Sequence, residues 1–246
     1  GVHLPSWDKI GADVKTPGSF WKLHQSRKLD LLKHIKDKTG RDWTTDTLLI
    51  GWARRIATYK RPGAILEDAK RFAAIARNTN RPIRLVISGR PHAADKDGQK
   101  IRKDLQELTD GELKDVAVYL PDYDLAQAEL LVAGCDVWLN TPVVGFEACG
   151  TSGMKAALNG VLPCSTKDGW VDEAEFYKVG WVLDDTAVGK DILNKLEHDI
   201  APMYYTRDAG GVPELWEEHM RNSRDMIINQ FSATRMMRAY VEMMYS

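Results

Sequence analysis

Cysteine is scarce in this sequence, and its three copies form no recognisable motif. Cys135, Cys149 and Cys164 are an odd number, and no C-x-x-C spacing occurs. This pattern argues against a disulfide framework and a cysteine-ligated zinc site, and it is typical of a reducing compartment. The six histidines form no H-E-x-x-H motif. We therefore expect a cytoplasmic protein that holds no metal ion.

An excess of charge of either sign is also missing. The sequence has 34 lysines and arginines against 35 aspartates and glutamates, which gives a net charge of −1. A nearly neutral chain lacks the basic surface that is typical of nucleic-acid binding. No apolar run reaches the length of a membrane span, and no signal peptide is recognisable. Neither nucleic acid nor a membrane is expected as a partner.

Several common phosphate-site and nucleophile motifs are absent as well. The first predicted strand is not followed by G-x-G-x-x-G, and no G-x-x-x-x-G-K-[ST] motif occurs. Dinucleotide and P-loop sites are therefore not predicted. The G-x-S-x-G elbow of serine hydrolases is missing too. The chain begins at Gly1 without a methionine, so we expect a fragment or a processed form.

Short apolar runs alternate with amphipathic segments along most of the chain. Strands are predicted at residues 47–52, 83–88, 116–120, 136–140, 161–164 and 181–183. Helices are predicted at residues 20–38, 64–78, 97–108, 124–133, from 154 onward, and at 191–198, 213–226 and 231–245. This alternation indicates βαβ units, and hence an α/β fold with a doubly wound, parallel, Rossmann-like sheet. We expect one domain, with a lead-in loop and helix at 1–46, the core at 47–190 and C-terminal helices at 191–246.

A segment rich in small residues follows the predicted strand at 136–140. Gly150, Thr151, Ser152 and Gly153 come directly before a helical stretch. The first N–H groups of a helix lack intrahelical acceptors, so this helix start can bind an anion. Lys155 is four residues after Thr151 and shares its helix face. Its amine could pair with the same anion or react with an aldehyde.

A basic segment follows the first predicted strand. Arg54, Arg55 and Lys60 lie at a predicted helix start, where the helix dipole disfavours cations. Their placement therefore indicates a bound anion, most simply phosphate. The carboxyl ends of parallel strands meet at one edge of the sheet. We expect the segments at 53–63, 89–92, 122–124 and 147–155 to converge there.

The residues alone leave alternatives open around Lys155. Its neighbours Met154, Ala156 and Ala157 are apolar, so we expect a buried lysine, which needs a partner or a modification. Glu147 is the strongest structural alternative, as an ion-pair partner for this lysine. Glu147 and Asp168 could also form a catalytic carboxylate pair, although the sequence sets no distance between them. His92 is interpreted as an ordinary loop histidine.

Several segments together resemble the α-glucan (glycogen, maltodextrin) phosphorylases, in particular their short bacterial and archaeal branch. Residues 147–155 are similar to the lysine signature of that family, and residues 54–61 to its basic loop. Further matching segments are residues 120–123, 158–160 and 168–170, together with Gly1, Val2, His3 and Trp7. The resemblance covers nearly the whole chain, and its motifs follow the order and spacing of the family.

The resemblance implies the C-terminal lobe of a two-lobed GT-B glycosyltransferase. The family transfers glucose from an α-1,4-glucan end to inorganic phosphate, giving glucose 1-phosphate. It uses pyridoxal phosphate bound as a Schiff base to the lysine that matches Lys155. The cofactor's 5′-phosphate exchanges a proton with the substrate phosphate. Two neighbouring dianions repel each other, which a cluster of cations and a helix N-terminus would offset.

The roles of individual residues follow from the same resemblance. The cofactor would be held by Lys155, Arg54, Tyr123, Asn140, Thr151 and Ser152. Arg55 and Lys60 would hold phosphate where cofactor and substrate meet, and with Lys155 they are the expected catalytic residues. The donor glucose would be bound by Glu147 and by the backbone N–H groups of Cys149 and Gly150.

The chain also departs from the family pattern. Larger members have Gly-Asn in place of Ser152-Gly153, and Cys149 and Arg90 replace a more usual serine and lysine. The N-terminal lobe of the family is missing, so we expect the chain alone to be inactive on glucan. An apolar face exposed without that lobe could drive self-association.

Two other functions compete with this interpretation. One is the lobe of a nucleotide-sugar glycosyltransferase of the glycogen-synthase type, which carries a second glutamate eight residues after the first. That position is Lys155 here, which favours the phosphorylase. The other is a non-catalytic binding module that keeps only the fold.

Overall fold

A computed structural model describes residues 16–245 of the chain. Gly1, Val2, His3 and Trp7, which contribute to the family resemblance, lie outside this range. None of the helices in the described part is long and apolar enough to cross a membrane.

Six parallel strands form one sheet, as the alternating pattern predicts. The strands are β1 (Leu48–Ala53), β2 (Ile83–Ser88), β3 (Ala117–Leu120), β4 (Val137–Asn140), β5 (Leu162–Thr166) and β6 (Trp181–Leu183). Their order in the sheet is β3-β2-β1-β4-β5-β6, and every neighbouring pair is parallel. This is the Rossmann-like order, so the predicted fold class is confirmed.

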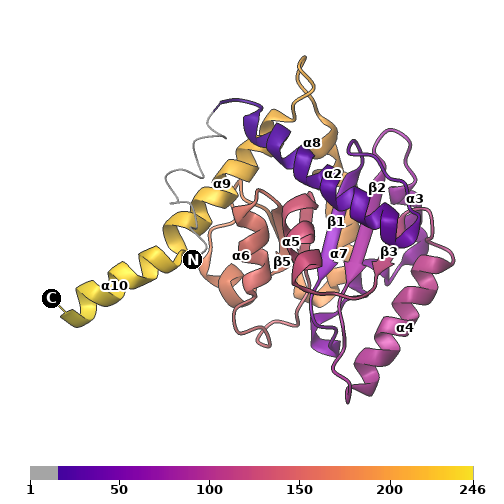
Figure 1. Ribbon diagram of the computed structural model, residues 1–246, viewed down its shortest axis with the longest axis horizontal. Coiled ribbons are helices and arrows are strands. Elements are labelled where there is room, and N and C mark those ends of the chain that lie inside the picture. The colour runs from indigo at the N-terminus through magenta and orange to yellow at the C-terminus, as the bar shows by residue number, and fades with distance from the viewer. Residues whose placement is uncertain (1–15, 246) are drawn as a thin grey trace.

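Helices cover both faces of the sheet (Figure 1). The α-helices are α2 (Ser19–Thr39), α3 (Ala69–Ala76), α4 (Lys96–Asp110), α5 (Leu125–Gly134), α6 (Thr151–Leu158), α7 (Val188–Lys195), α8 (Ala201–Tyr205), α9 (Glu214–Gln230) and α10 (Ala233–Tyr245). Short 3₁₀ turns are η2 (Thr58–Lys60), η3 (Ala64–Leu66), η4 (Gly169–Glu173) and η5 (Asp185–Ala187), and a π turn, η6 (Leu196–Ile200), joins α7 to α8.

Two of the differences between predicted and observed helix bounds have a local cause. The helix expected at 64–78 is divided into η3 and α3, because the side chain of Asp68 accepts a hydrogen bond from Arg71 N at 2.9 Å and caps a new helix there. The helix expected from residue 154 begins at Thr151, directly after Gly150, which has the left-handed conformation. The small residues before Met154 therefore belong to the first turn of α6.

Alternate residues of β1 point into two separate cores. Leu48, Ile50 and Trp52 pack with residues of α3, α7 and α8, whereas Leu49 and Ala53 pack with α2 and α5. Strands buried on both faces are expected to be apolar throughout, and all of β1 is buried. The apolar run at 47–52 thus reflects its position in the centre of the sheet.

A buried ionic cluster links α2 to the start of β4. Lys28 Nζ lies 2.5 Å from Asp136 Oδ2 and 2.9 Å from the hydroxyl of Tyr204. His24 Nε2 lies 2.8 Å from the other oxygen of Asp136, and Leu49 N donates to Oδ2 at 2.7 Å. Burial alone would raise the pKa of Asp136, but Lys28 and His24 outweigh it and hold this pKa below its usual range.

One carboxylate of α9 binds the start of α2. Glu217 of α9 accepts hydrogen bonds from the backbone N–H groups of Gly18, Phe20 and Trp21, at 2.7, 2.9 and 3.2 Å. These are the N–H groups at the start of α2 that lack intrahelical acceptors. Beyond α9, α10 extends away from the body of the molecule (Figure 1).

Candidate active site at the carboxyl ends of β1 and β4

The candidate site lies where the order of strands reverses. Strand β1 pairs with β2 on one side and with β4 on the other, and the chain passes from one half of the sheet to the other there. Ligands of open parallel sheets bind in the crevice at such a point. Arg54 directly follows β1, and Asn140 is the last residue of β4.

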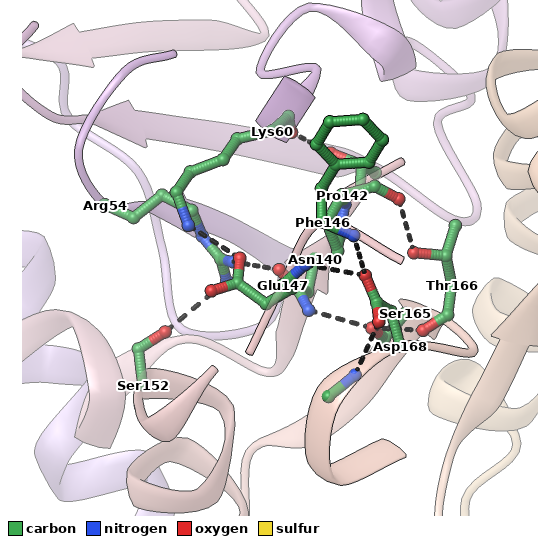
Figure 2. A network of polar contacts seen from close by, with 12 residues as sticks. Arg54, Lys60, Asn140, Pro142, Phe146, Glu147, Ser152, Ser165, Thr166 and Asp168 are labelled. Atoms are coloured by element: carbon green, nitrogen blue, oxygen red, sulfur yellow. Dashed lines mark hydrogen bonds and ion pairs between the residues drawn. The ribbon is translucent and has the colours of Figure 1, made fainter. Parts of the chain in front are cut away.

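Arg54 is a buried cation in the centre of a polar network (Figure 2). Its Nη1 donates to Asn140 Oδ1, and its Nη2 lies 3.4 Å from Ser152 Oγ. Asn140 is oriented in turn by Ser165, whose hydroxyl lies 2.9 Å from Asn140 Nδ2. Burial lowers the pKa of Arg54 to about 10, and Glu147 partly opposes the shift. Arg54 therefore stays charged at neutral pH.

Glu147 pairs with Lys60 and not with Lys155. Its Oε2 lies 2.6 Å from Lys60 Nζ and 3.7 Å from Arg54 Nη1. Lys60 is the last residue of η2, and the hydroxyl of Thr141 contacts its carbonyl at 2.8 Å. One carboxylate thus lies between two cations that come from the predicted basic segment.

Lys155 is exposed, so the expectation of a buried lysine is wrong. The apolar residues around it face the other side of α6: Gly153, Ala156 and Ala157 are buried, whereas Thr151 and Lys155 are both exposed. The predicted sharing of a helix face by Thr151 and Lys155 agrees with this. Among residues 16–245, no hydrogen bond or ion pair engages the amine of Lys155, which leaves it accessible for reaction.

Asp168 holds the segment that carries Glu147. Its Oδ2 accepts hydrogen bonds from Glu147 N at 2.8 Å and Phe146 N at 3.2 Å, and its Oδ1 accepts from Gly169 N at 2.9 Å. Asp168 is therefore a positioning residue and not one half of a carboxylate pair. The sequence contained a weak signal for this role, since an Asp-Gly pair is typical of a turn.

The structure brings five of the predicted site residues into one network. These are Arg54, Lys60, Asn140, Glu147 and Ser152 (Figure 2). Tyr123 is half-buried and near enough for the charge of Arg54 to oppose the burial that raises its pKa. Arg55 and Cys149 are exposed, and Cys149 contributes its carbonyl, which accepts from Trp170 N at 3.0 Å. Sequence reasoning missed Thr141 and Ser165, which only orient other members.

The network fits a phosphate group. Arg54 Nε is buried and has no hydrogen-bond partner among the described residues. A buried donor without an acceptor is costly, and a guanidinium matches the geometry of phosphate oxygens. The start of α6, at Thr151 and Ser152, adds N–H groups that lack intrahelical acceptors. The residues that would hold pyridoxal phosphate are thus compatible with it.

Two glycines of this region should differ in their tolerance of alanine. Gly150 has φ 83°, and an added Cβ would lie no closer than 3.6 Å to a neighbour, so only backbone strain of about 1 kcal/mol is expected. At Gly169, with φ 59°, the Cβ would lie 2.4 Å from the Cys149 carbonyl oxygen. We expect Gly169→Ala to lower the free energy of unfolding by about 3 kcal/mol, through strain and displaced backbone. Urea unfolding of both variants measures this difference, and equal losses would contradict it.

Comparisons with known proteins agree on one family. The model of the carbohydrate phosphorylase family matches residues 3–175. The chain is 36% identical to the glycogen phosphorylase of Aquifex aeolicus over 99% of its own length and 39% of that protein. It is 34% identical to the glycogen phosphorylase of Mycobacterium tuberculosis, covering all of this chain and 34% of the relative. It is 36% identical to the maltodextrin phosphorylase of Thermococcus litoralis, covering 92% and 30%. The chain thus spans 30–39% of the length of these relatives.

Proposed function

The chain belongs to the carbohydrate phosphorylase family, and from this membership we propose that it is the C-terminal, cofactor- and donor-binding lobe of an α-glucan phosphorylase of GT-B architecture. The proposed reaction transfers a glucosyl group from the end of an α-1,4-glucan to inorganic phosphate, giving glucose 1-phosphate. The relatives named glycogen and maltodextrin phosphorylase support this substrate class. The part of those proteins that this chain does not cover is a required partner in the proposal.

One observation carries the proposal. The buried Arg54 and the Lys60 amine converge on Glu147, beside the start of the helix that carries an accessible Lys155. A structural ion pair would require one cation for this carboxylate. The site has two cations, an unsatisfied guanidinium Nε and a helix N-terminus, and Glu147 supplies a single negative charge. The excess of positive potential supports anion binding at this position.

In the proposed site, each residue binds or orients one part of the reactants. Arg54, Tyr123, Asn140 and Ser152 hold the cofactor phosphate together with Thr151 at the start of α6. Arg55 and Lys60 hold the substrate phosphate. Glu147 accepts hydrogen bonds from hydroxyls of the donor glucose. The backbone N–H groups of Cys149 and Gly150 donate hydrogen bonds to its hydroxyl oxygens. Bound pyridoxal phosphate would supply a phosphate group that exchanges a proton with the substrate phosphate.

The electrostatic contribution of these residues is to make two adjacent phosphates tolerable. Like charges at such distances repel strongly in a partly buried site. Arg54 is held charged and immobile by Asn140 and Glu147, so it needs little reorganisation when an anion binds. Lys60 must exchange Glu147 for phosphate, which makes the carboxylate available to a sugar hydroxyl.

Covalent uptake of pyridoxal phosphate tests the proposed function. The chain is incubated with the cofactor, reduced with borohydride and analysed by peptide mass spectrometry, with titration of a uridine diphosphate sugar in parallel. We expect one equivalent of cofactor on the peptide that contains Lys155 and no saturable binding of the nucleotide sugar. Nucleotide-sugar binding without cofactor uptake would favour a glycosyltransferase of the glycogen-synthase type instead.

Glucan phosphorolysis by this chain alone should be undetectable. The chain covers 39% or less of the phosphorylase relatives compared above, and the proposed reaction requires the part of those proteins that it does not cover. The assay supplies pyridoxal phosphate, glycogen and phosphate, and it measures glucose 1-phosphate in a coupled reaction. Measurable product from the chain alone would show that the second lobe is dispensable.

A further inference from the structure

A second polar cavity lies at the carboxyl ends of β2 and β3. Its volume is about 530 Å³, and it is bounded by the segment at 89–93, the end of β3 and one side of α4. None of the five residues that form the Arg54–Glu147 network lines it. The cavity is therefore separate from the proposed active site, although both open at the same edge of the sheet.

Two arginines give this cavity a positive charge. Arg90 comes from the loop after β2, and Arg102 comes from α4. Asp122 pairs with Arg90 at 3.2 Å and balances one of them. Arg102 has no hydrogen bond or ion pair with any residue between 16 and 245. A cation without a partner thus faces a polar cavity.

The buried side chain of Tyr119 lines the cavity and adds no negative charge. Its hydroxyl donates a hydrogen bond to the carbonyl of Gly89. Burial raises the pKa of Tyr119 to about 12, while the charges of Arg102 and Arg90 act in the opposite direction. All three side chains line the same cavity, and the Tyr119 hydroxyl stays protonated at neutral pH.

The remaining lining is polar and neutral. Gln99 and Gln106 of α4 line the cavity, and Gln99 Nε2 is held by the carbonyl of Ala93 at 2.6 Å. Typical small-molecule sites occupy roughly 300–1,000 Å³. The cavity is thus larger than a bare phosphate needs, and its amide groups match a hydroxylated ligand.

We propose that this cavity binds a small phosphorylated sugar, whose phosphate is held by Arg102 and Arg90 and whose hydroxyls contact Gln99 and Gln106. Guanidinium groups bind phosphate oxygens through paired N–H donors, which suits two arginines on neighbouring elements. Asp122 competes with the ligand for Arg90, so the affinity depends mainly on Arg102.

Binding of ribose 5-phosphate to the chain tests this site, with calorimetry as the readout. Arg102→Ala should weaken binding at least tenfold, because it removes the unpaired cation. Lys103→Ala is the matched control, because this neighbouring helix lysine pairs with Glu107 at 3.5 Å and does not line the cavity. Equal effects of the two variants, or no binding to the unmodified chain at millimolar concentration, would overturn the proposal.

Further arms identify the ligand and separate this site from the proposed active site. Asp122→Asn should tighten binding severalfold, since it releases Arg90 from its ion pair. Lys60→Ala should leave ribose 5-phosphate binding unchanged, even if it weakens binding of pyridoxal phosphate. Inorganic phosphate should bind this cavity at least tenfold more weakly than the sugar phosphate. Equal affinity for free phosphate would overturn the assignment of a sugar ligand, as would loss of binding in Lys60→Ala.

Discussion

Lys155→Ala should abolish covalent uptake of pyridoxal phosphate completely. An aldehyde reacts with an uncharged amine, and Lys155 offers an exposed amine on the helix whose first turn borders Arg54. Alanine has the highest helix propensity, and the side chain of Lys155 has no partner in the described chain. The variant should therefore fold as well as the parent. Mass spectrometry after borohydride reduction measures the bound cofactor.

Lys190→Ala provides a matched control for this experiment. Lys190 is also an exposed helix lysine, in α7, away from the candidate site. The Lys190→Ala variant should bind one equivalent of pyridoxal phosphate, as the parent chain does. Lys155→Arg should keep the positive charge but form no covalent adduct. Label that persists in Lys155→Ala, or disappears equally in Lys190→Ala, would exclude Lys155 as the attachment residue.

Asp136→Asn should lower the free energy of unfolding by about 3–5 kcal/mol. Both Asp136 and Lys28 have fully buried side chains, so the asparagine would leave a buried ammonium group without its counter-charge. His24 and Leu49 would also lose a charged acceptor. Asp42→Asn is the control: Asp42 pairs with Lys36 on the surface, where a change of less than about 1 kcal/mol is expected. Urea unfolding compares the two, and equal effects would contradict the argument.

The Asp136 carboxylate should also make the stability of the fold depend on pH in acid. The folded pKa of Asp136 lies below its ordinary value, so its contribution to stability is complete above about pH 4, where the unfolded group is ionised. This contribution is lost as the pH falls through the folded pKa. The melting temperature of Asp136→Asn should thus depend less on pH below about 4 than that of the parent. Parallel curves would show that other carboxylates dominate acid unfolding.

Much of the fold could be predicted from the sequence because each strand carries a strong local signal. The run of apolar residues at 47–52 reads as a buried strand, and β1 is buried throughout. Boundaries decided by one side chain were harder to predict. The aspartate at position 68 looks like any helix-surface residue, yet it caps a new helix and divides the predicted segment at 64–78.

The candidate site could be predicted only as a set of residues. Convergence of Arg54, Asn140 and Ser152 follows from their places at neighbouring strand and helix ends, and the structure brings them into contact. The ion-pair partner of Glu147 depends on how η2 folds back toward the 143–147 segment. The spacing of residues in the sequence does not predict this arrangement. Lys60 therefore occupies the place that the sequence reasoning gave to Lys155.

The hydrogen bonds from Gly18, Phe20 and Trp21 to Glu217 also constrain how the chain can fold. The Glu217 carboxylate is separated in sequence by up to 199 residues from the N–H groups that donate to it. Contacts of such sequence separation form late, because closing a long loop costs entropy before the contact is made. During synthesis on a ribosome, the first turn of α2 would stay uncapped until α9 has left the exit tunnel. The sheet can assemble before that moment, but the first turn of α2, which contains Phe20 and Trp21, depends on a glutamate that is made almost 200 residues later.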